Sequence, residues 1–125
     1  SRLDRGTSGV LLLALDPGAA VRAEAIHDSG QAVKIYEFYS AADSLAAGPG
    51  ESWVRDDDLD GKPASTRFQR LAKAPRGDFV LYRAEISRGR RHQIRRHAAA
   101  SGIPVLGDDE HGGDPFDRLM LHCTE

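Results

Sequence analysis

The feature that most constrains the fold is a pair of strand-like segments separated by a tight turn. Residues 65–71 and 79–87 have the character of strands, and Ala-Pro-Arg-Gly lies between them at positions 74–77. Proline and glycine in such a place favour a turn that reverses the chain. Strands joined in this way pair antiparallel, so the sequence predicts a sheet that contains at least one hairpin.

The region before this hairpin predicts a strand followed by a helix. The apolar run at residues 10–15 is short and bounded by turn residues, which is typical of a buried strand. Asp16 followed by Pro17 predicts a helix start, with Asp16 as the N-cap. The helix is expected to run to about Asp28 and to end at Gly30.

Residues 32–41 predict a further strand with two different faces. Alternation along a strand places on one face Val33, Ile35 and Glu37, and on the other Lys34, Tyr36 and Phe38. The remaining expectations are a loop over 43–64 with a short hairpin around Trp53-Val54, a helix over 92–101 stopped by Gly102, and a closing strand over 119–122. Strands outnumber helices, so the predicted class is α+β, with a mixed, mainly antiparallel sheet and flanking helices.

Length and composition predict a single ordinary domain. The chain has 125 residues, enough to bury a core. Its longest apolar run has six residues, whereas a helix that crosses a bilayer needs about 20, so no membrane partner is expected. The single cysteine, Cys123, excludes an internal disulfide framework and predicts a cytoplasmic location.

Charge is distributed unevenly along the chain, although the net charge is only −2. Residues 67–97 contain ten Arg or Lys and two acidic residues, whereas residues 43–60 contain six acidic residues and one Arg. Such asymmetry can create a phosphate-binding face on a mildly acidic protein. Nucleic-acid binding is therefore compatible with the composition.

A carboxylate lies in a loop rich in glycine and hydroxyl groups near the start of the chain. Asp4 is flanked by Arg2 and Arg5, and nearby positive charge favours the anionic form of a carboxylate. Thr7 and Ser8 are expected to hold the loop through hydrogen bonds between side chain and backbone. On local grounds alone, a surface Asp in a turn is the alternative interpretation.

This loop, Arg-Leu-Asp-x-x-Thr-Ser-Gly, resembles a motif of the RluA-type pseudouridine synthases, which isomerise uridine in ribosomal and transfer RNA. Further blocks fit that family in the same order: Lys34-Ile35-Tyr36, Gly89 to His97, Gly102 to Asp108, and Arg118 to His122. The resemblance implies the pseudouridine synthase catalytic fold, a mixed sheet with helices beside it and a central cleft. Since the family's catalytic domain has a segment before the Asp motif, residues 1–125 are expected to be its C-terminal part, truncated at the N-terminus and beginning within that motif.

The resemblance also implies catalytic roles for three residues. Asp4 matches the family's catalytic carboxylate, which acts at the junction of sugar and base. Arg95 matches the arginine of the Gln-Ile-Arg element and is expected to form a bidentate ion pair with Asp4. Tyr36 matches the family's Lys-x-Tyr motif, and it is expected to stack on the uracil and to take part in proton transfer from carbon 5.

The expected partner is structured RNA, either rRNA or tRNA. A uridine in folded RNA must leave its stack before it can react, and Arg2 is expected to enter the vacated space or to bind a neighbouring phosphate. Arginines can bind backbone phosphates, which supply affinity without reading sequence. The further candidates for RNA binding or for support of the site are Lys34, Arg88, Arg90, Arg91 and Arg96.

No cofactor and no metal are expected, because the isomerisation requires no redox step, phosphate donor or metal ion. The segment Asp56 to Gly61 opens like a calcium loop, but Arg67 occupies the position where such a loop requires Glu. His92 and His97 are five residues apart and lack the zinc-protease spacing.

Two alternatives remain open at this point. One is a non-catalytic module that binds or folds RNA and keeps the cleft without turnover. The other is a metal-dependent hydrolase that uses Asp4 and the histidines. The target uridine and the oligomeric state are not predicted by the sequence.

Overall fold

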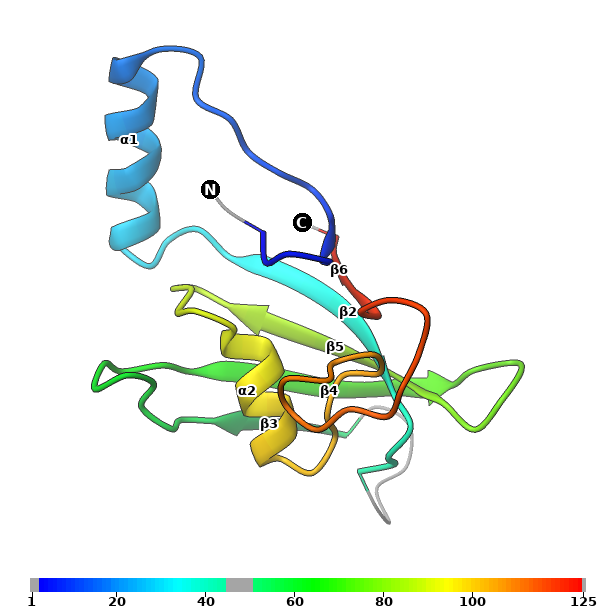
Figure 1. Cartoon of the computed structure of the whole chain (residues 1–125). Coiled ribbons are helices and arrows are strands. Elements are labelled where there is room, and N and C mark those ends of the chain that lie inside the picture. Colours follow the sequence, from blue (N-terminus) through cyan, green and yellow to red (C-terminus); the bar gives the residue numbers. More distant parts are fainter. Residues whose placement is uncertain (1–2, 45–50, 125) are drawn as a thin grey trace.

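The computed structural model describes residues 3–44 and 51–124. Figure 1 shows a six-stranded sheet with one helix packed on it and a second helix standing away from it. In spatial order the strands are β1 (Ser8–Gly9), β6 (Leu121–Cys123), β2 (Lys34–Ser40), β5 (Val80–Ile86), β4 (Thr66–Lys73) and β3 (Ser52–Arg55). The helices are α1 (Pro17–Asp28) and α2 (Gln93–Ala100). β1 runs parallel to β6 and the other pairs are antiparallel, which confirms the predicted α+β class.

The hairpin predicted from the sequence is formed by β4 and β5. Phe68 lies opposite Ala84 in the register, and the N–H of Ala74 donates to the carbonyl of Phe79 across the turn at 2.8 Å. The short hairpin expected near Trp53 is β3 paired with β4, and the closing strand begins two residues later than predicted, at Leu121.

The core lies between one face of the sheet and α2. Phe38 on β2 stacks on Tyr82 of β5, with ring centroids 5.4 Å apart, and meets Phe68 of β4 edge to face at 6.0 Å. All three rings are buried, and α2 covers them with Ile94 and Ala98. Burial alternates along β2 and β5, as expected for an antiparallel sheet with one buried face, and this confirms the predicted faces over residues 34–40, a strand shorter than the predicted 32–41.

The helix α1 begins and ends where the sequence predicts. Asp16 accepts a hydrogen bond from the N–H of Ala19 at 2.7 Å, the contact of an N-cap. Gly30 has a φ of +75°, a left-handed conformation that favours glycine and stops the helix. Neither α1 nor α2, the helices of the described part of the chain, is long and apolar enough to cross a bilayer.

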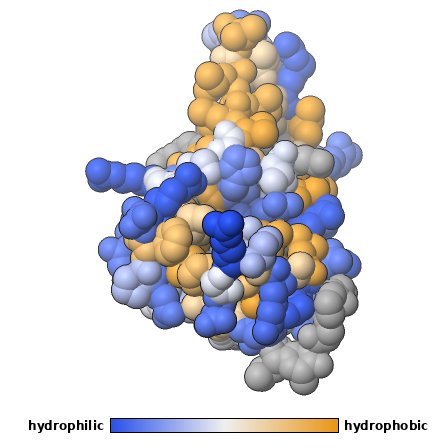
Figure 2. Space-filling view, turned by 90° about the vertical axis from the view of Figure 1, so that its right-hand side faces the viewer, coloured by the Kyte–Doolittle hydropathy of each residue, from blue (hydrophilic) through white to orange (hydrophobic). Residues whose placement is uncertain are grey.

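The predicted buried strand at residues 10–15 is wrong. Only Ser8 and Gly9 pair with β6, and after Val10, whose N–H donates to Cys123 at 3.0 Å, the chain leaves the sheet and runs out to α1 (Figure 1). Leu13 and Leu15 are 70% and 95% exposed. Figure 2 shows the hydrophobic side chains gathered in this projecting part of the molecule. Apolar composition is not sufficient for a strand, because a strand also needs a neighbour that pairs with its backbone.

Candidate active site

Three residues far apart in the sequence meet at the edge where β1, β6 and β2 lie side by side. Asp4 comes from the loop before β1, Tyr36 from the middle of β2, and Arg95 from α2. The guanidinium Nη1 of Arg95 lies 3.9 Å from Oδ2 of Asp4. The charge of Asp4 also contributes to raising the pKa of Tyr36, because the two side chains are close.

The Asp4 loop is held by its attachment to the end of the sheet. The carbonyl of Asp4 accepts from the N–H of Thr7 at 2.9 Å, which closes a turn. The hydroxyl of Ser8 contacts Nδ1 of His122 at 2.7 Å and accepts from Nη2 of Arg118 at 2.9 Å. Ser8 therefore ties the loop to the segment around β6, mainly through side chains.

The expectation for Thr7 is wrong. Its hydroxyl oxygen is buried and has no hydrogen-bond partner among the described residues. The Ser8 hydroxyl does reach a backbone carbonyl, that of Leu121, but at 3.5 Å. Of the two hydroxyl groups, only that of Ser8 anchors the loop within the described structure, whereas Thr7 contributes through its backbone N–H.

Arg95 has a second carboxylate partner, which lies closer than Asp4. Its Nε donates to Oδ2 of Asp108 at 2.9 Å and its Nη2 donates to Oδ1 at 2.6 Å. The Asp108 side chain is fully buried and that of Arg95 is 6% exposed. The bidentate pair expected between Arg95 and Asp4 is therefore formed with Asp108, and the contact with Asp4 is longer and single.

The pairing of Arg95 with Asp108 shifts the pKa of both groups. Burial of Asp108 raises its pKa, but the hydrogen bonds and charge of Arg95 outweigh burial, so the pKa lies below its usual value. The hydrogen bonds to Asp108 raise the pKa of Arg95. The sequence analysis gave Asp108 no role in the site. It ends the block from Gly102 to Asp108, and that block was the available signal.

Tyr36 lies on the core face of β2 and is 7% exposed. Burial is the main cause that raises the pKa of its hydroxyl, and the thiol of Cys123, opposite it on β6, adds to the effect. The hydroxyl is thus neutral over the physiological pH range. Only a small part of this side chain reaches the surface beside Asp4.

The basic residues predicted to bind RNA divide into two groups. Arg96 is occupied by Asp60, to which it donates at 3.1 and 3.2 Å, and Arg90 donates from Nε to the carbonyl of Pro63 at 3.0 Å. Arg88 and Arg91 are exposed, and Lys34 is half-buried. Arg2 lies outside the described residues.

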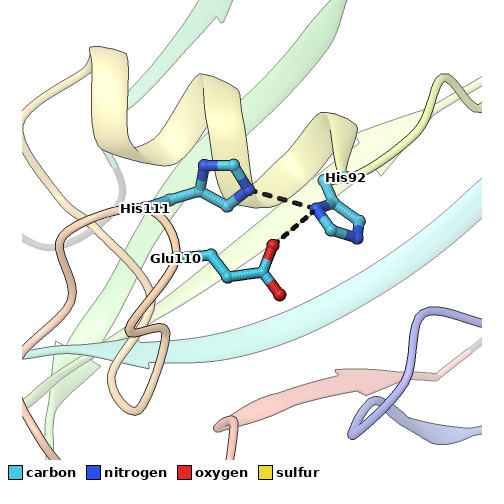
Figure 3. A group of neighbouring side chains, drawn as sticks. All are labelled: His92, Glu110 and His111. Atoms are coloured by element: carbon cyan, nitrogen blue, oxygen red, sulfur yellow. Dashed lines mark hydrogen bonds and ion pairs between the residues drawn. The ribbon is translucent and has the colours of Figure 1, made fainter.

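One group of side chains near Arg95 has the composition of a metal site. His92, Glu110 and His111 each offer one ligand atom, and these atoms lie within 4.8 Å of one another (Figure 3). Nδ1 of His92 is 3.1 Å from Nε2 of His111 and 3.8 Å from Oε2 of Glu110. Burial lowers the pKa of His111, so its imidazole is neutral near neutral pH.

Both the sequence and the fold are similar to those of known proteins. The sequence model of a family described as RNA pseudouridylate synthase matches residues 1–100. An uncharacterized RNA pseudouridine synthase of Zymomonas mobilis is 36% identical over 138 aligned positions, which cover 98% of this chain and 62% of that protein. The ribosomal large subunit pseudouridine synthase C of Escherichia coli is 35% identical, with 98% of this chain and 41% of that protein covered.

A third relative and a solved structure extend the comparison. The tRNA pseudouridine synthase C of Salmonella typhi is 32% identical, and the match covers 59% of its length. The structure of human RNA pseudouridylate synthase domain containing 1 superposes with a TM-score of 0.78 at 26% identity, covering 98% of this chain and 60% of that one. The chain thus spans between about two fifths and three fifths of the length of the relatives named here.

Proposed function

Because the chain belongs to the RNA pseudouridylate synthase family, in agreement with the RluA-type resemblance, we propose that it isomerises a specific uridine to pseudouridine in rRNA or tRNA. The observation that carries the proposal is the convergence of Asp4, Tyr36 and Arg95 from a loop, a strand and a helix. The reaction breaks the N-glycosidic bond, rotates the base and joins it again through carbon 5. Relatives are named for rRNA and for tRNA, so the substrate is proposed as a class of structured RNA.

Asp4 is proposed as the catalytic carboxylate. Its side chain is 31% exposed, whereas Asp108, the other carboxylate beside Arg95, is fully buried. Only the first can reach a ribose that approaches from solvent. Because the loop that carries Asp4 is hydrogen-bonded to the edge of the sheet, the carboxylate is held in a defined position.

Arg95 is proposed to orient Asp4, and Asp108 in turn to orient Arg95. Two hydrogen bonds fix the plane of the guanidinium, so its remaining edge faces Asp4 at 3.9 Å. The guanidinium thus has a bidentate contact with the buried Asp108 and a single, longer contact with Asp4, on the side from which substrate is proposed to approach. This leaves Asp4 room to move toward the sugar.

Tyr36 is proposed to contact the detached uracil and to serve as a proton carrier at carbon 5. Its neutral hydroxyl lies near Asp4 and beside Cys123, at the inner end of the site. A neutral phenol can donate or accept a proton through hydrogen bonds as the base rotates. Tyr36→Phe is expected to preserve the fold, because the ring remains, and to slow the reaction.

Arg88 and Arg91 are proposed as phosphate contacts, because they are exposed and their guanidinium groups make no hydrogen bond or ion pair with described residues. Lys34 is proposed to support them, since its Nζ lies beside Gly89, in the segment that carries both arginines. Arg2 is proposed to enter the space left by an extruded base. The proposed rRNA or tRNA substrate supports a cytoplasmic location. The free cysteine Cys123, the single cysteine of the chain, supports it as well.

The test is release of tritium from RNA labelled at uridine carbon 5, with the protein at its full natural length. Asp4→Asn is expected to abolish release while RNA affinity is retained, because the isostere removes only the charge. Asp58→Asn is the matched control, since Asp58 is exposed and distant in sequence from the site. Binding without release by the wild type on both rRNA and tRNA would establish the alternative, an RNA-binding module without turnover.

A further inference from the structure

The three side chains in Figure 3 are contributed by two separate segments that the fold brings together. His92 precedes the first turn of α2, whereas Glu110 and His111 lie in the loop that follows Asp108. Two imidazoles and one carboxylate form a donor set of catalytic-type zinc sites, which keep a fourth position open. Magnesium and calcium prefer oxygen ligands instead.

The two ring nitrogens are spaced as two ligands of one ion would be. Bonds of about 2.0–2.1 Å at tetrahedral angles place two zinc-bound nitrogens about 3.3 Å apart. The two ring nitrogens of His92 and His111 are 3.1 Å apart, and the carboxylate oxygen of Glu110 is 3.8 Å from the first of them. The two rings are nearly perpendicular, at 83°, so they meet edge to face and do not stack.

Both segments are held before any ion arrives. Gln93, next to His92, accepts from the N–H of Arg90 at 2.9 Å and donates to the carbonyl of Ser65 at 2.8 Å. The loop is closed by two backbone hydrogen bonds, from Gly107 to Asp114 at 2.9 Å and from Gly113 to Asp108 at 2.7 Å. The ligand atoms therefore need only small side-chain adjustments to bind a cation.

The local charge also favours a divalent cation. Arg95 contacts Glu110 of this group, and three carboxylates lie within 4 Å of its guanidinium: Asp4, Asp108 and Glu110. The guanidinium and the three carboxylates together carry a net charge of −2. A divalent ion would balance that charge, and Glu110, 63% exposed, leaves a path for it from solvent.

We propose that His92, Glu110 and His111 bind one divalent transition-metal ion of the zinc type. The ion replaces the hydrogen bond between the two rings, and in the bound state each ring carries a proton only on the nitrogen that does not bind the ion. The isomerisation proposed above has no step that needs this ion. The proposed ion site lies next to the candidate catalytic residues, because Glu110 is within 4 Å of Arg95. Glu110 would contact both the ion and Arg95.

The test is calorimetric titration of the folded protein with Zn²⁺, with Co²⁺ absorption as a spectroscopic signature of coordination. One ion is expected per chain, and Mg²⁺ is expected not to bind. His111→Gln, Glu110→Gln and His92→Asn are each expected to weaken binding by at least about tenfold. Asn is chosen at position 92 because His92 has a φ of +52°, and asparagine tolerates that conformation.

His122→Gln is the matched control, because His122 is exposed on β6 and bonded to Ser8, outside the group. It is expected to keep the affinity of the wild type. Circular dichroism of the ion-free variants separates loss of ligands from loss of fold. The proposal is overturned if the folded wild type binds no Zn²⁺, if folded variants bind as tightly as the wild type, or if the control is weakened equally.

Discussion

Arg95 is closer to Asp108 than to Asp4: the guanidinium donates to the first carboxylate at 2.6 and 2.9 Å and lies 3.9 Å from the second. The buried carboxylate thus fixes the arginine, and the arginine presents its free edge to the exposed carboxylate. A single guanidinium joins the core of the protein to the place where substrate would enter. Much of the behaviour of the site depends on this one relationship.

Asp108→Asn is expected to destabilise the fold by about 3 kcal/mol, because it leaves the buried guanidinium of Arg95 without its main counter-charge. Denaturant unfolding measures the change. Asp60→Asn is the matched control, since Asp60 also pairs bidentately with an arginine, Arg96, but at the exposed surface. That control is expected to lose much less stability, because solvent screens an exposed ion pair, and equal losses in the two variants would contradict the prediction.

Arg95→Lys is expected to lower the rate of isomerisation by about 100-fold, because lysine keeps the charge but cannot hold two carboxylates in a fixed plane. Tritium release under single-turnover conditions measures the effect. Arg96→Lys, one residue further along α2, is the control and should react at close to the wild-type rate. A wild-type rate in Arg95→Lys would show that charge alone suffices at this position.

Acid is expected to weaken the fold partly through Asp108. Its pKa is lower in the folded protein than in the unfolded chain, where it is close to 3.8. The stability that it contributes is therefore complete above about pH 4 and is lost as the pH falls through the folded pKa. Unfolding at a series of pH values should show a shallower acid decline in Asp108→Asn, while Asp43, whose pKa is lowered mainly by its hydrogen bond from Arg70, still contributes. Parallel declines would exclude Asp108 as a source.

Gly107→Ala is expected to disrupt the loop that carries Asp108, because a Cβ at position 107 would collide with the backbone carbonyl of Arg118. Gly112→Ala is the matched control in the same loop. Both glycines have a positive φ, +83° and +84°, but a Cβ at position 112 meets no atom within 4 Å. Thermal unfolding should show the larger loss for Gly107→Ala. Similar losses would assign the effect to backbone strain alone.

Phe68→Ala is expected to cost about 3–5 kcal/mol, because Phe68 is fully buried between Phe38 and Trp53. Leu13→Ala is expected to change stability by less than about 0.5 kcal/mol, since that leucine is 70% exposed. Denaturant unfolding of both variants checks the contrast. A large loss in Leu13→Ala would mean that residues 10–15 are covered in solution.

The elements that the sequence predicted well are those whose signals are local. The Asp16-Pro17 start of α1 and the turn between β4 and β5 depend on neighbouring residues alone. The strand expected at residues 10–15 depends on a pairing partner, which the apolar pattern does not contain. The same run of leucines is equally compatible with an exposed segment.

The sequence predicted the residues of the site better than it predicted the contacts between them. The motifs indicated Asp4, Tyr36 and Arg95, and the fold brings these together, although their catalytic roles stay predictions. The partner of the arginine was not predicted, because Asp108 lies 13 positions away in a loop whose path only the fold defines. For the same reason the approach of His111 to His92 was not visible in the spacing of the histidines.

The parallel pairing of β1 with β6 joins residues that are 114 positions apart, Ser8 with His122 and Gly9 with Cys123. Contacts between such distant residues form late, because a long stretch of chain must be ordered first. During synthesis, the Asp4 loop would leave the ribosome early and would have to wait for residues 121–123 before it could dock. A nascent chain of this protein would therefore carry Asp4 long before the loop has the strand partner that fixes its position.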